Sequence, residues 1–584
     1  MQTTREKMDN FTQALQNFVD REYDTQTAQV VDMWRRPLGE RVAEGEAIAD
    51  IEVVRVEHPL AWLRCRENPA KFRSADTLRL DRGNPFDPPY YTCELEEERD
   101  TTLVVRAGFR VNFYGLRPGP GWVLDREVVD VRFLLRGVLD QLADGSPHSQ
   151  QVLSILQGRV RPQFDYSTAL GAYEMARHLS LDASQVEAFA RGLSTQDFFL
   201  IQGPPGTGKT YVLAYMAARL AQQGERVLIT AFTHRAINNA LRKIAKVTGF
   251  KRIAKIGQRL RADDLTWETG SVPNYEHFAD SPFQPHGAGY IVGGTCFAVR
   301  TSRLRDAFFD TVIFDEAGQL TLPLAAAGML AGRRYIFIGD HKQMSPIIVA
   351  EHEPQWLARS LFENLFEVAP GTMLTTTYRM NAEINAYPSQ RFYEGRIHPS
   401  DEARNRFLRL GGPPGRFDSL LRPSPGAIFV AVDHRGKGMR APQEADIAAG
   451  IVAEAVGRGL SPAEIAVVAP YRAQVREIRA ALRKLHIDPD GDGVVVDTVE
   501  RIQGQERDVI VISLTTSDPA HAAQRAEFYF QPNRLNVAIT RPRTKRIVIG
   551  SPRLFDAQPA DPEHRRWVDH FRGLYEASHV VVAR

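Results

Sequence analysis

The residues GPPGTGKT, at positions 203–210, have types and spacing that suit the binding of phosphate groups. They follow the apolar run FFLI and precede TYVLAYMAARL, so we expect the loop to join a strand to a helix. Glycine lets the backbone N–H groups of such a loop converge on phosphate oxygens at the helix N-terminus. Lys209 would reach the outer phosphates, and Thr210 would bind Mg²⁺. The pattern predicts a nucleotide site formed by Gly203, Pro204, Pro205, Gly206, Thr207, Gly208, Lys209 and Thr210.

Two adjacent carboxylates, Asp315 and Glu316, follow a second apolar run, TVIF. A carboxylate at the end of a buried strand is costly unless it meets a cation, so we predict that Asp315 links to the metal ion. Glu316 is placed to orient and deprotonate an attacking water, which favours hydrolysis over transfer to another acceptor. An Asp-Glu pair can also be a simple helix cap, but the phosphate loop upstream favours the catalytic interpretation.

Two glutamines are candidates for nucleotide contacts. Gln343, in GDHKQMSP at another strand end, is an uncharged group that can sense the γ-phosphate or the attacking water. His341, in the same loop, is expected to be an exposed loop residue. Gln185 precedes the phosphate-loop strand, and its amide can pair with both the donor and the acceptor edge of adenine.

Two arginines in the C-terminal half are candidates for stabilising a transition state. Arg379 lies in TTTYRMN and Arg541 in NRLNVAITRPRTK, in a region without a phosphate loop of its own. A guanidinium inserted against the γ-phosphate accelerates hydrolysis by ~10³–10⁵. A surface salt bridge is the commoner role of a single arginine, but both residues lie within extended motifs. A site completed by a second lobe would open and close with hydrolysis, as a motor does.

The elements that must position these residues alternate as in doubly wound α/β lobes. One series of apolar runs comprises FFLIQG, RVLITAF, TVIFDEA and RYIFIGD, and a second comprises AIFVAVD, EIAVVAP, VVVDTV, DVIVISL and RIVIGS. Such runs are typical of parallel strands buried on both faces. Upstream, short β-like runs broken by turns predict a small antiparallel barrel. The predicted organisation is a stalk-helix region at 1–50, a barrel at 51–124, returning stalk helices at 125–180, a first lobe at 181–350 with a short polar insert at 263–287, and a second lobe at 351–584.

The composition is that of an ordinary globular protein. The 584 residues are 43% hydrophobic and 25% charged, with a formal net charge of +2, so a nucleic-acid partner would need a local basic surface. The polar N-terminus does not resemble a secretory signal, and no apolar run approaches the ~20 residues of a membrane span. Cys65, Cys93 and Cys296 show no CxxC pairing and are expected to be buried thiols. These features predict a soluble, cytoplasmic protein.

In their order and spacing, these motifs resemble those of superfamily 1B helicases. The similarity is greatest to the group of the nonsense-mediated-decay helicase, the immunoglobulin-mu-binding-protein helicase and senataxin. It rests on GPPGTGKT, ITAFTHRAINNAL, GGTCFAV, IFDEAGQ, GDHKQMSP, TTYRMNAEINAYPSQRFYEG, VVAPYRAQ, VDTVERIQGQERDVIVIS and NRLNVAITRPRTK. The resemblance implies two RecA-like lobes that hydrolyse ATP between them, and an accessory barrel on paired stalk helices. It also implies movement from 5′ to 3′ along a single strand.

The resemblance assigns further roles to matching residues. Tyr378 would stack on the adenine beside Arg379, while Gly504 and Glu506 would meet the γ-phosphate and the ribose. Hydroxyls and neighbouring N–H groups would hold the strand backbone, and such contacts are independent of base sequence. The nucleic-acid contacts implied in this way, with their polar and basic neighbours, are Thr233, His234, Arg235, Thr295, Arg472 and Thr498. Arg235, Arg472 and also Lys243 could equally belong to solvated helix faces.

Several positions depart from the group's usual pattern. Phe232, Thr233 and His234 stand where Pro-Ser-Asn is usual, Asn381 replaces a histidine, and Pro542 replaces an alanine. These changes leave the ATP chemistry intact but bear on strand preference and coupling. The insert at 263–287 is short where several relatives carry a subdomain, and no separate domain shows a carboxylate–lysine nuclease constellation.

Three functions remain open at this point. The first is an ATP-dependent helicase or translocase, the second an ATPase that strips or remodels nucleoprotein complexes, and the third an ATP-gated clamp. The expected cofactors are ATP and Mg²⁺. The expected partners are single-stranded nucleic acid and single-strand/duplex junctions, with no membrane, and a monomer is expected. Recognition of the 2′-hydroxyl depends on the placement of a few groups, so the sequence does not distinguish DNA from RNA.

Overall fold

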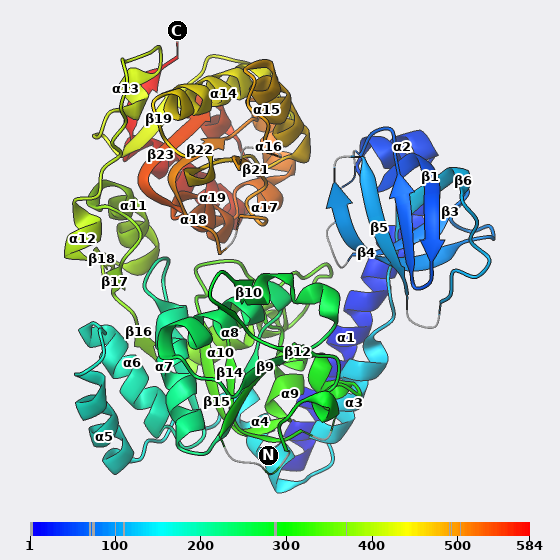
Figure 1. Cartoon of the computed structure of the whole chain (residues 1–584), viewed down its shortest axis with the longest axis vertical. Coiled ribbons are helices and arrows are strands. Elements are labelled where there is room, and N and C mark those ends of the chain that lie inside the picture. The colour runs from blue at the N-terminus through cyan, green and yellow to red at the C-terminus, as the bar shows by residue number, and fades with distance from the viewer. Residues whose placement is uncertain are drawn as a thin grey trace. The chain divides into compact units, whose positions relative to one another are not determined.

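The computed structural model describes residues 4–583 except for 69, 71, 73–75, 100, 109–110, 285, 287–288, 306, 370, 490, 492 and 503. It divides into two compact units (Figure 1). The first contains residues 1–153, 322–327 and 347–358, and the second contains residues 154–321, 328–346 and 359–584. Among the described residues, no helix combines the length and the apolar character needed to cross a membrane.

The first unit contains a closed antiparallel barrel. Its strands follow the order β1-β2-β5-β4-β3-β6, and they are β1 (Ala47–Glu57), β2 (Leu60–Arg64), β3 (Thr77–Asp81), β4 (Tyr91–Arg99), β5 (Thr102–Ala107) and β6 (Gly119–Arg126). Alternate residues such as Leu78 and Leu80, or Leu103 and Val105, are buried, because successive side chains of a strand point to opposite faces. The barrel interior is therefore a packed apolar core.

Helices flank the barrel in the sequence. They are α1 (Thr4–Trp34), α2 (Leu38–Ala43), α3 (Arg132–Leu142) and α4 (Pro147–Leu156). The segment 347–358, which belongs to the same unit, is held along α1. The carboxylate of Glu22 accepts hydrogen bonds from the backbone N–H groups of Val349 and Ala350, and its Oε1 lies 2.8 Å from Nε2 of His352. Two ring contacts, Phe18 with His352 and Phe11 with Trp356, extend this attachment.

The first lobe is built on an eight-stranded parallel sheet with the order β12-β9-β13-β8-β14-β15-β7-β16. The strands are β7 (Phe198–Gln202), β8 (Arg226–Thr230), β9 (Ile253–Ile256), β12 (Asn274–Tyr275), β13 (Tyr290–Gly293), β14 (Phe309–Phe314), β15 (Gly332–Gly339) and β16 (Thr372–Met373). One face packs on α5 (Tyr166–Ala176), α6 (Ala183–Ser194), α7 (Lys209–Gln222) and α8 (His234–Thr248). Two further helices are α9 (Leu322–Met329) and α10 (Leu361–Val368), and the insert contains a short hairpin of β10 (Thr266–Trp267) and β11 (Gly270–Ser271).

The second lobe has a six-stranded parallel sheet with the order β21-β20-β22-β23-β19-β24. The strands are β19 (Ala427–Ala431), β20 (Ile465–Val468), β21 (Val495–Asp497), β22 (Arg507–Ser513), β23 (Pro542–Gly550) and β24 (His579–Val582). Its main helices are α11 (Ala382–Tyr393), α14 (Pro442–Gly457), α15 (Arg472–Lys484), α18 (Pro532–Ile539) and α19 (Pro562–Glu576). The shorter elements are β17 (Thr376–Thr377), β18 (His398–Pro399), α12 (Asp401–Arg404), α13 (Asp418–Leu421), α16 (Pro519–Gln524) and α17 (Ala526–Tyr529).

The strands of the second sheet are apolar on both faces because helices cover both. Ile428 and Val430 pack with α14 and α15, whereas Phe429 packs with α18 and α19. Figure 1 shows these two helix pairs on opposite sides of the sheet. The continuous apolar runs of the sequence correspond to these doubly covered strands, so the predicted fold class is confirmed: two doubly wound parallel-sheet lobes together with helices and a small barrel.

Candidate ATP site and nucleic-acid interface

The phosphate loop connects β7 to α7 at the carboxyl edge of the first sheet. Gly206 and Gly208 have φ of +74° and +80°, a left-handed conformation that glycine adopts without penalty. A Cβ added to Gly203 would lie 1.9 Å from Cγ of Lys209, so the Lys209 side chain runs directly over the start of the loop. Oγ1 of Thr207 donates a hydrogen bond to the carbonyl of Pro204 at 2.7 Å. The loop is thus shaped for an anion, and a 14-residue helix begins at its end.

The two carboxylates follow β14, next to this loop. Nζ of Lys209 lies 3.8 Å from Oε2 of Glu316. Glu316 has φ of +50°, an unusual conformation for a residue other than glycine that costs about 1–3 kcal/mol. Asp315 is buried; its burial and then the charge of Glu316 raise its pKa to about 7, while Lys209 opposes this shift.

Asp315 and Thr210 fit a Mg²⁺ site by their chemistry. A buried carboxylate with a raised pKa gains from a nearby cation, and Thr210 adds a hydroxyl from the first turn of α7. Mg²⁺ in nucleotide sites is commonly held by one or two protein oxygens together with phosphates. These two residues therefore suffice as the protein's share of such a site.

Gln343, which belongs to the first lobe, contacts an arginine of the second lobe. Its Nε2 donates to Oδ2 of Asp340 at 2.7 Å, and its Oε1 accepts from Nη2 of Arg541 at 3.3 Å. Arg541 is buried, and its Nε donates to the carbonyl of Val537 at 3.0 Å. Burial, and next the charge of Arg379, lower the pKa of Arg541 to about 9. The pKa is lowered although the charges of Glu316 and Glu506 act in the opposite direction, so this desolvated arginine gains from an added anion.

Sequence reasoning missed the group that holds Gln343 in position. Oδ2 of the buried Asp340 also accepts from the Tyr393 hydroxyl at 2.7 Å, and Nδ2 of Asn536 lies 2.8 Å from the same hydroxyl. Asn536 additionally donates to the carbonyl of Lys342 at 2.8 Å. Each of these residues lies within a motif, in GDHKQ, RFYEG or NRLNVA, but nothing in the local sequence indicates that the three motifs meet.

Arg379 lies beside the phosphate loop. Its Nε donates to Oε2 of Glu506 at 2.8 Å, and its Nη1 donates to the carbonyl of Thr540, next to Arg541. Burial would raise the pKa of Glu506, but the charge of Arg379 and those of other arginines outweigh this and hold it below its ordinary value. A Cβ on Gly206 would lie 2.5 Å from Cβ of Arg379, so the arginine's backbone is in close contact with the loop. The structure therefore brings both candidate arginines together with the phosphate loop and Gln343.

Two of the residues predicted for the base, Tyr378 and Gln185, are hydrogen-bonded to the phosphate loop. The exposed Tyr378 donates from its backbone N–H to the carbonyl of Gly206 and from its hydroxyl to Asp182, both at 2.8 Å. Gln185 is buried, and its amide already accepts from the Asp182 N–H and donates to the carbonyl of Thr207 at 3.0 Å. Gln185 thus supports the loop, and because its amide has a second N–H and a second lone pair, these two bonds do not exclude pairing with adenine. Gly504, with φ of +77°, is exposed near Glu506 in sequence.

The first-lobe residues implied for nucleic acid lie at helix starts along the carboxyl edge of the sheet. Oγ1 of Thr233 accepts from the N–H of Ala236 at the start of α8, and Oγ1 of Thr295 accepts from the N–H of Ala298, both at 3.2 Å. Arg235 is exposed. His234 is half-buried; burial and the charges of nearby Lys255 and two arginines lower its pKa to about 3, so it is neutral and adds no positive charge.

The residues of the second lobe that are implied for nucleic acid follow β20 and β21. Arg472 is the first residue of α15, and Thr498 directly follows β21, where it is largely buried. The N–H of Thr498 donates to Oδ1 of Asp497 at 2.8 Å. In the first lobe, Nζ of Lys243 lies 5.3 Å from the ring centroid of Tyr211, so this lysine of α8 makes a cation–π contact within the protein.

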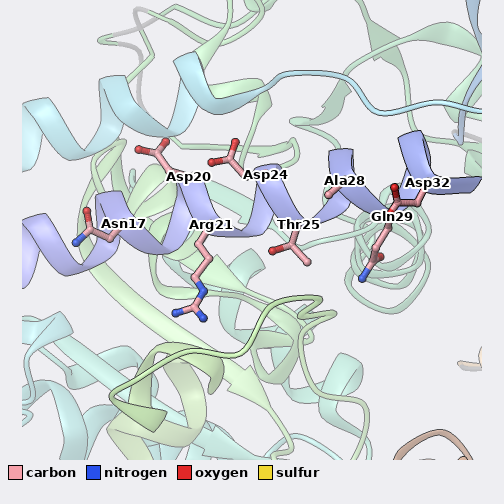
Figure 2. A pocket seen from close by; sticks show the side chains of 8 residues that line it. All are labelled: Asn17, Asp20, Arg21, Asp24, Thr25, Ala28, Gln29 and Asp32. Carbon is pink, nitrogen blue, oxygen red and sulfur yellow. The ribbon is translucent and has the colours of Figure 1, made fainter. Parts of the chain in front are cut away.

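A separate hollow of about 570 Å³ runs along α1 and is lined only by residues of that helix (Figure 2). Asp20, Asp24 and Asp32 give this face an acidic character, with Arg21 as its single cation. Asp20 and Asp24 project to the same side of α1 in Figure 2 and pair with Arg136 and Arg132 of α3. These two ion pairs offset the charges of Asp20 and Asp24, so the net acidic charge of this face is small.

The chain is similar to known domain families and to curated proteins. Two family models, each described as an AAA domain, match residues 180–263 with 289–351 and residues 357–553. A DNA replication ATP-dependent helicase/nuclease from Mus musculus is 27% identical over 71% of this chain and 42% of its own length. The protein of the same name from Saccharomyces cerevisiae is 27% identical over 68% of this chain and 28% of its own length. The chain thus spans less than half of the length of these relatives.

The solved structures that match are more distant. The crystal structure of arterivirus nonstructural protein 10, a helicase, is 14% identical over 86% of this chain and 77% of that chain, with a TM-score of 0.39. The two AAA-domain matches contain the phosphate loop, the carboxylate pair, Gln343 and both arginines. Together with the motif set, the two AAA-domain matches and the similarity to the curated helicase/nucleases support a superfamily 1 helicase in the group of the nonsense-mediated-decay helicase.

Proposed function

We propose that the chain is an ATP-driven motor that moves from 5′ to 3′ along single-stranded nucleic acid and unwinds duplexes. The observation that carries this proposal is the contact of Arg541 with Gln343. Arg379 lies nearby, in contact with the phosphate loop. A site that needs arginines from a second lobe links hydrolysis to movement of that lobe. The direction of movement rests on the family resemblance.

Residues of the first lobe would bind the nucleotide and activate the attacking water. The N–H groups of the phosphate loop and Lys209 would hold the β- and γ-phosphates. Glu316 would orient the attacking water and accept its proton. Asp315 and Thr210 would hold Mg²⁺, which, when bound, offsets negative charge on the phosphates.

Residues of the second lobe would stabilise the transition state. Arg541 is desolvated and close to another cation, so charge that develops on the γ-phosphate would relieve a cost already present in the folded protein. Arg379 would give up its hydrogen bond to Glu506 and bind the phosphate instead. Gln343 would report loss of the γ-phosphate through Asp340 to Tyr393 and Asn536, because these side chains are hydrogen-bonded in one chain.

The first test is steady-state ATP hydrolysis without nucleic acid and then with single-stranded DNA or RNA. We expect strong stimulation by at least one strand, and the better strand identifies the track. Glu316→Gln should lower kcat by ~10²–10⁴ while ATP still binds, because only the general base is lost. Glu351→Gln, on an exposed side chain, is the matched control. Slow hydrolysis with every strand would contradict a motor and favour an ATP-gated clamp.

A second test separates unwinding from stripping of bound protein. Partial duplexes with a 5′ or a 3′ single-stranded tail are mixed with protein and ATP, and strand release is followed by fluorescence. The proposal predicts release from 5′-tailed duplexes and little from 3′-tailed ones. Hydrolysis that displaces a protein from single strands without releasing any duplex would instead support a remodelling ATPase.

A further inference from the structure

Arg543 lies two residues after Arg541, at the start of β23, and its side chain is held by carboxylates. Its Nε donates to Oδ1 of Asp508 at 2.8 Å, and its Nη2 is paired with Glu464. The guanidinium group is planar and rigid, so these two partners also fix the direction of its third nitrogen, Nη1. Arg543 is therefore an oriented cation at the amino end of the second sheet.

The third nitrogen of Arg543 faces a carboxylate that also binds Arg379. Nη1 of Arg543 lies 3.8 Å from Oε1 of Glu506, which is within ion-pair distance but too long for a hydrogen bond. Oε2 of the same carboxylate accepts from Nε of Arg379 at 2.8 Å. Glu506 thus lies between two arginines, with a short bond to one and a longer contact to the other.

The backbone connects Arg543 to the segment that carries Arg379. The carbonyl oxygen of Arg543 accepts from the N–H of Asn381 at 3.2 Å, and Asn381 is only two residues after Arg379. The Asn381 side chain caps α11 by accepting from the N–H of Ile384, and it donates to the carbonyl of Thr544 at 3.1 Å. These bonds involve no atom of the Arg379 side chain. The two segments therefore stay attached whichever partner that side chain binds.

Movement of the Arg379 side chain would leave a charge to be compensated. In the proposed function, Arg379 gives up Glu506 and binds the phosphate. A carboxylate left without a cation beside a triphosphate is unfavourable, because like charges repel. Shortening the contact between Glu506 and Nη1 of Arg543 from 3.8 Å to a hydrogen bond requires a shift of only about 1 Å. The second arginine is thus close enough to take over the carboxylate.

We propose that Arg543 is a positioning residue that takes over the carboxylate of Glu506 when Arg379 turns to the γ-phosphate. This inference rests on the proposed function. Without nucleotide, Glu506 keeps Arg379 in place. With ATP bound, Arg543 neutralises Glu506 and so lowers the cost of moving Arg379. Arg543 acts through these two residues, because its own side chain remains bound to Asp508 and Glu464.

The test uses the full chain and measures steady-state ATP hydrolysis with the single strand, DNA or RNA, that stimulates the wild type more. Arg543→Gln and Arg543→Lys are each made in the wild-type chain and in Glu506→Gln. Arg458→Gln is the matched control, because Arg458 also pairs with two carboxylates, those of Asp418 and Glu454. Its side chain is 14% exposed, compared with 25% for Arg543. Thermal unfolding reports whether each variant is folded, and a fluorescent ATP analogue reports nucleotide affinity.

In the wild-type chain, Arg543→Gln should lower kcat about tenfold while KM and analogue affinity change less than about threefold, because Arg379 acts mainly in the transition state. Arg543→Lys, which keeps the charge but not the rigid fork, should lose less. In Glu506→Gln, the same change of Arg543 should alter kcat less than about twofold. A neutral amide does not hold Arg379 by charge and needs no cation afterwards. Arg458→Gln should leave kcat unchanged in both chains.

Equal losses of kcat in the wild-type chain and in Glu506→Gln would indicate a merely structural role and would overturn the proposal. A kcat of Arg543→Gln within about twofold of the wild type would do the same. If Arg543→Gln does not fold, Arg543→Lys provides the comparison between the two chains. If the wild type hydrolyses ATP slowly with every strand, the proposed function itself fails and the role of Arg543 fails with it.

Discussion

Nη2 of Arg541 lies 3.3 Å from Oε1 of Gln343, so a buried guanidinium of the second lobe contacts the loop that follows β15 of the first lobe. Arg541 lies 163 positions C-terminal to Tyr378, whose neighbour is Arg379. The charge of Arg379 is nevertheless among the causes that lower the pKa of Arg541. Two cations held close together, one of them paired with Glu506, would gain from the charge of a triphosphate. The relationship makes the second lobe part of the ATP site.

Replacing Arg541 by methionine should separate catalysis from stability. Arg541→Met keeps the side-chain volume but removes the charge, so we expect kcat for ATP to fall by ~10³ or more. Stability without nucleotide should not fall, because a desolvated cation beside Arg379 is costly. Steady-state hydrolysis and thermal unfolding measure the two effects. Arg553→Met, on an exposed side chain, is the control, and a kcat within tenfold of wild type would argue against the assigned role.

Removing the Tyr393 hydroxyl should weaken the connection between the lobes. Tyr393→Phe removes the hydrogen bonds that the hydroxyl makes with Oδ2 of Asp340 and Nδ2 of Asn536, at a cost of about 1–3 kcal/mol. Urea unfolding measures the cost, and Tyr166→Phe is the exposed control. Asn536→Ala combined with Tyr393→Phe should cost less than the sum of the two single changes, since the residues share one network. Strict additivity would mean that the network does not act as a unit.

The pKa of Asp315, raised to about 7, predicts that Mg²⁺ binding depends on pH. A metal ligand must be deprotonated, so the affinity for Mg²⁺ in the presence of a fluorescent ATP analogue should fall about tenfold per pH unit below 7 and level off above it. Without metal, the stability of the fold changes with pH in the opposite direction. A carboxyl whose folded pKa is raised contributes stability that is present below about pH 4 and is lost as pH rises towards 7.

Asp315→Asn tests both consequences of that pKa. The variant should lose the pH dependence of Mg²⁺ binding together with most of the binding. Its thermal unfolding temperature without metal should decline less between pH 5 and pH 8 than that of the wild type. A wild-type affinity for Mg²⁺ that is constant between pH 6 and pH 8 would be inconsistent with the raised pKa.

The close approach of Arg379 to the phosphate loop predicts that Gly206 tolerates no side chain. A Cβ there would lie 2.5 Å from Cβ of Arg379 and 2.6 Å from Oγ1 of Thr377, at a φ of +74°. Gly206→Ala should therefore abolish ATP binding and lower stability, as isothermal calorimetry and thermal unfolding would show. Gly137→Ala, in α3 with nothing within 4 Å of the added Cβ, should be neutral or slightly stabilising. Normal ATP binding by Gly206→Ala would refute the close contact.

Much of the fold was predictable because its signals are local. The apolar runs that are buried on both faces became β7, β8, β14 and β15 and their counterparts in the second lobe, and the three cysteines are buried and free as predicted. The phosphate loop was also predictable, since its glycines, lysine and following helix are contiguous. In such cases a pattern within a dozen residues specifies the backbone.

The arrangement of side chains between distant segments was not predictable. Asp340, Tyr393 and Asn536 meet only because two sheets bring their loops together, and no periodicity encodes that meeting. The expectation that His341 is exposed was wrong: its ring packs at 4.9 Å from that of Phe366, and burial lowers its pKa. His234 was expected to contact nucleic acid, but its half-buried position among cations suits a structural role better.

The attachment of Glu22 to the segment 347–358 has a consequence for how the protein is made. Glu22 and His352 are separated by 330 positions, so the ribosome completes the donors for this carboxylate long after α1 has emerged. Until then the apolar face of α1 that carries Phe11 and Phe18 lacks the rings of Trp356 and His352. A fragment that ends after the barrel would therefore leave this face of α1 uncovered, and the face must wait for more than half of the chain before it can pack.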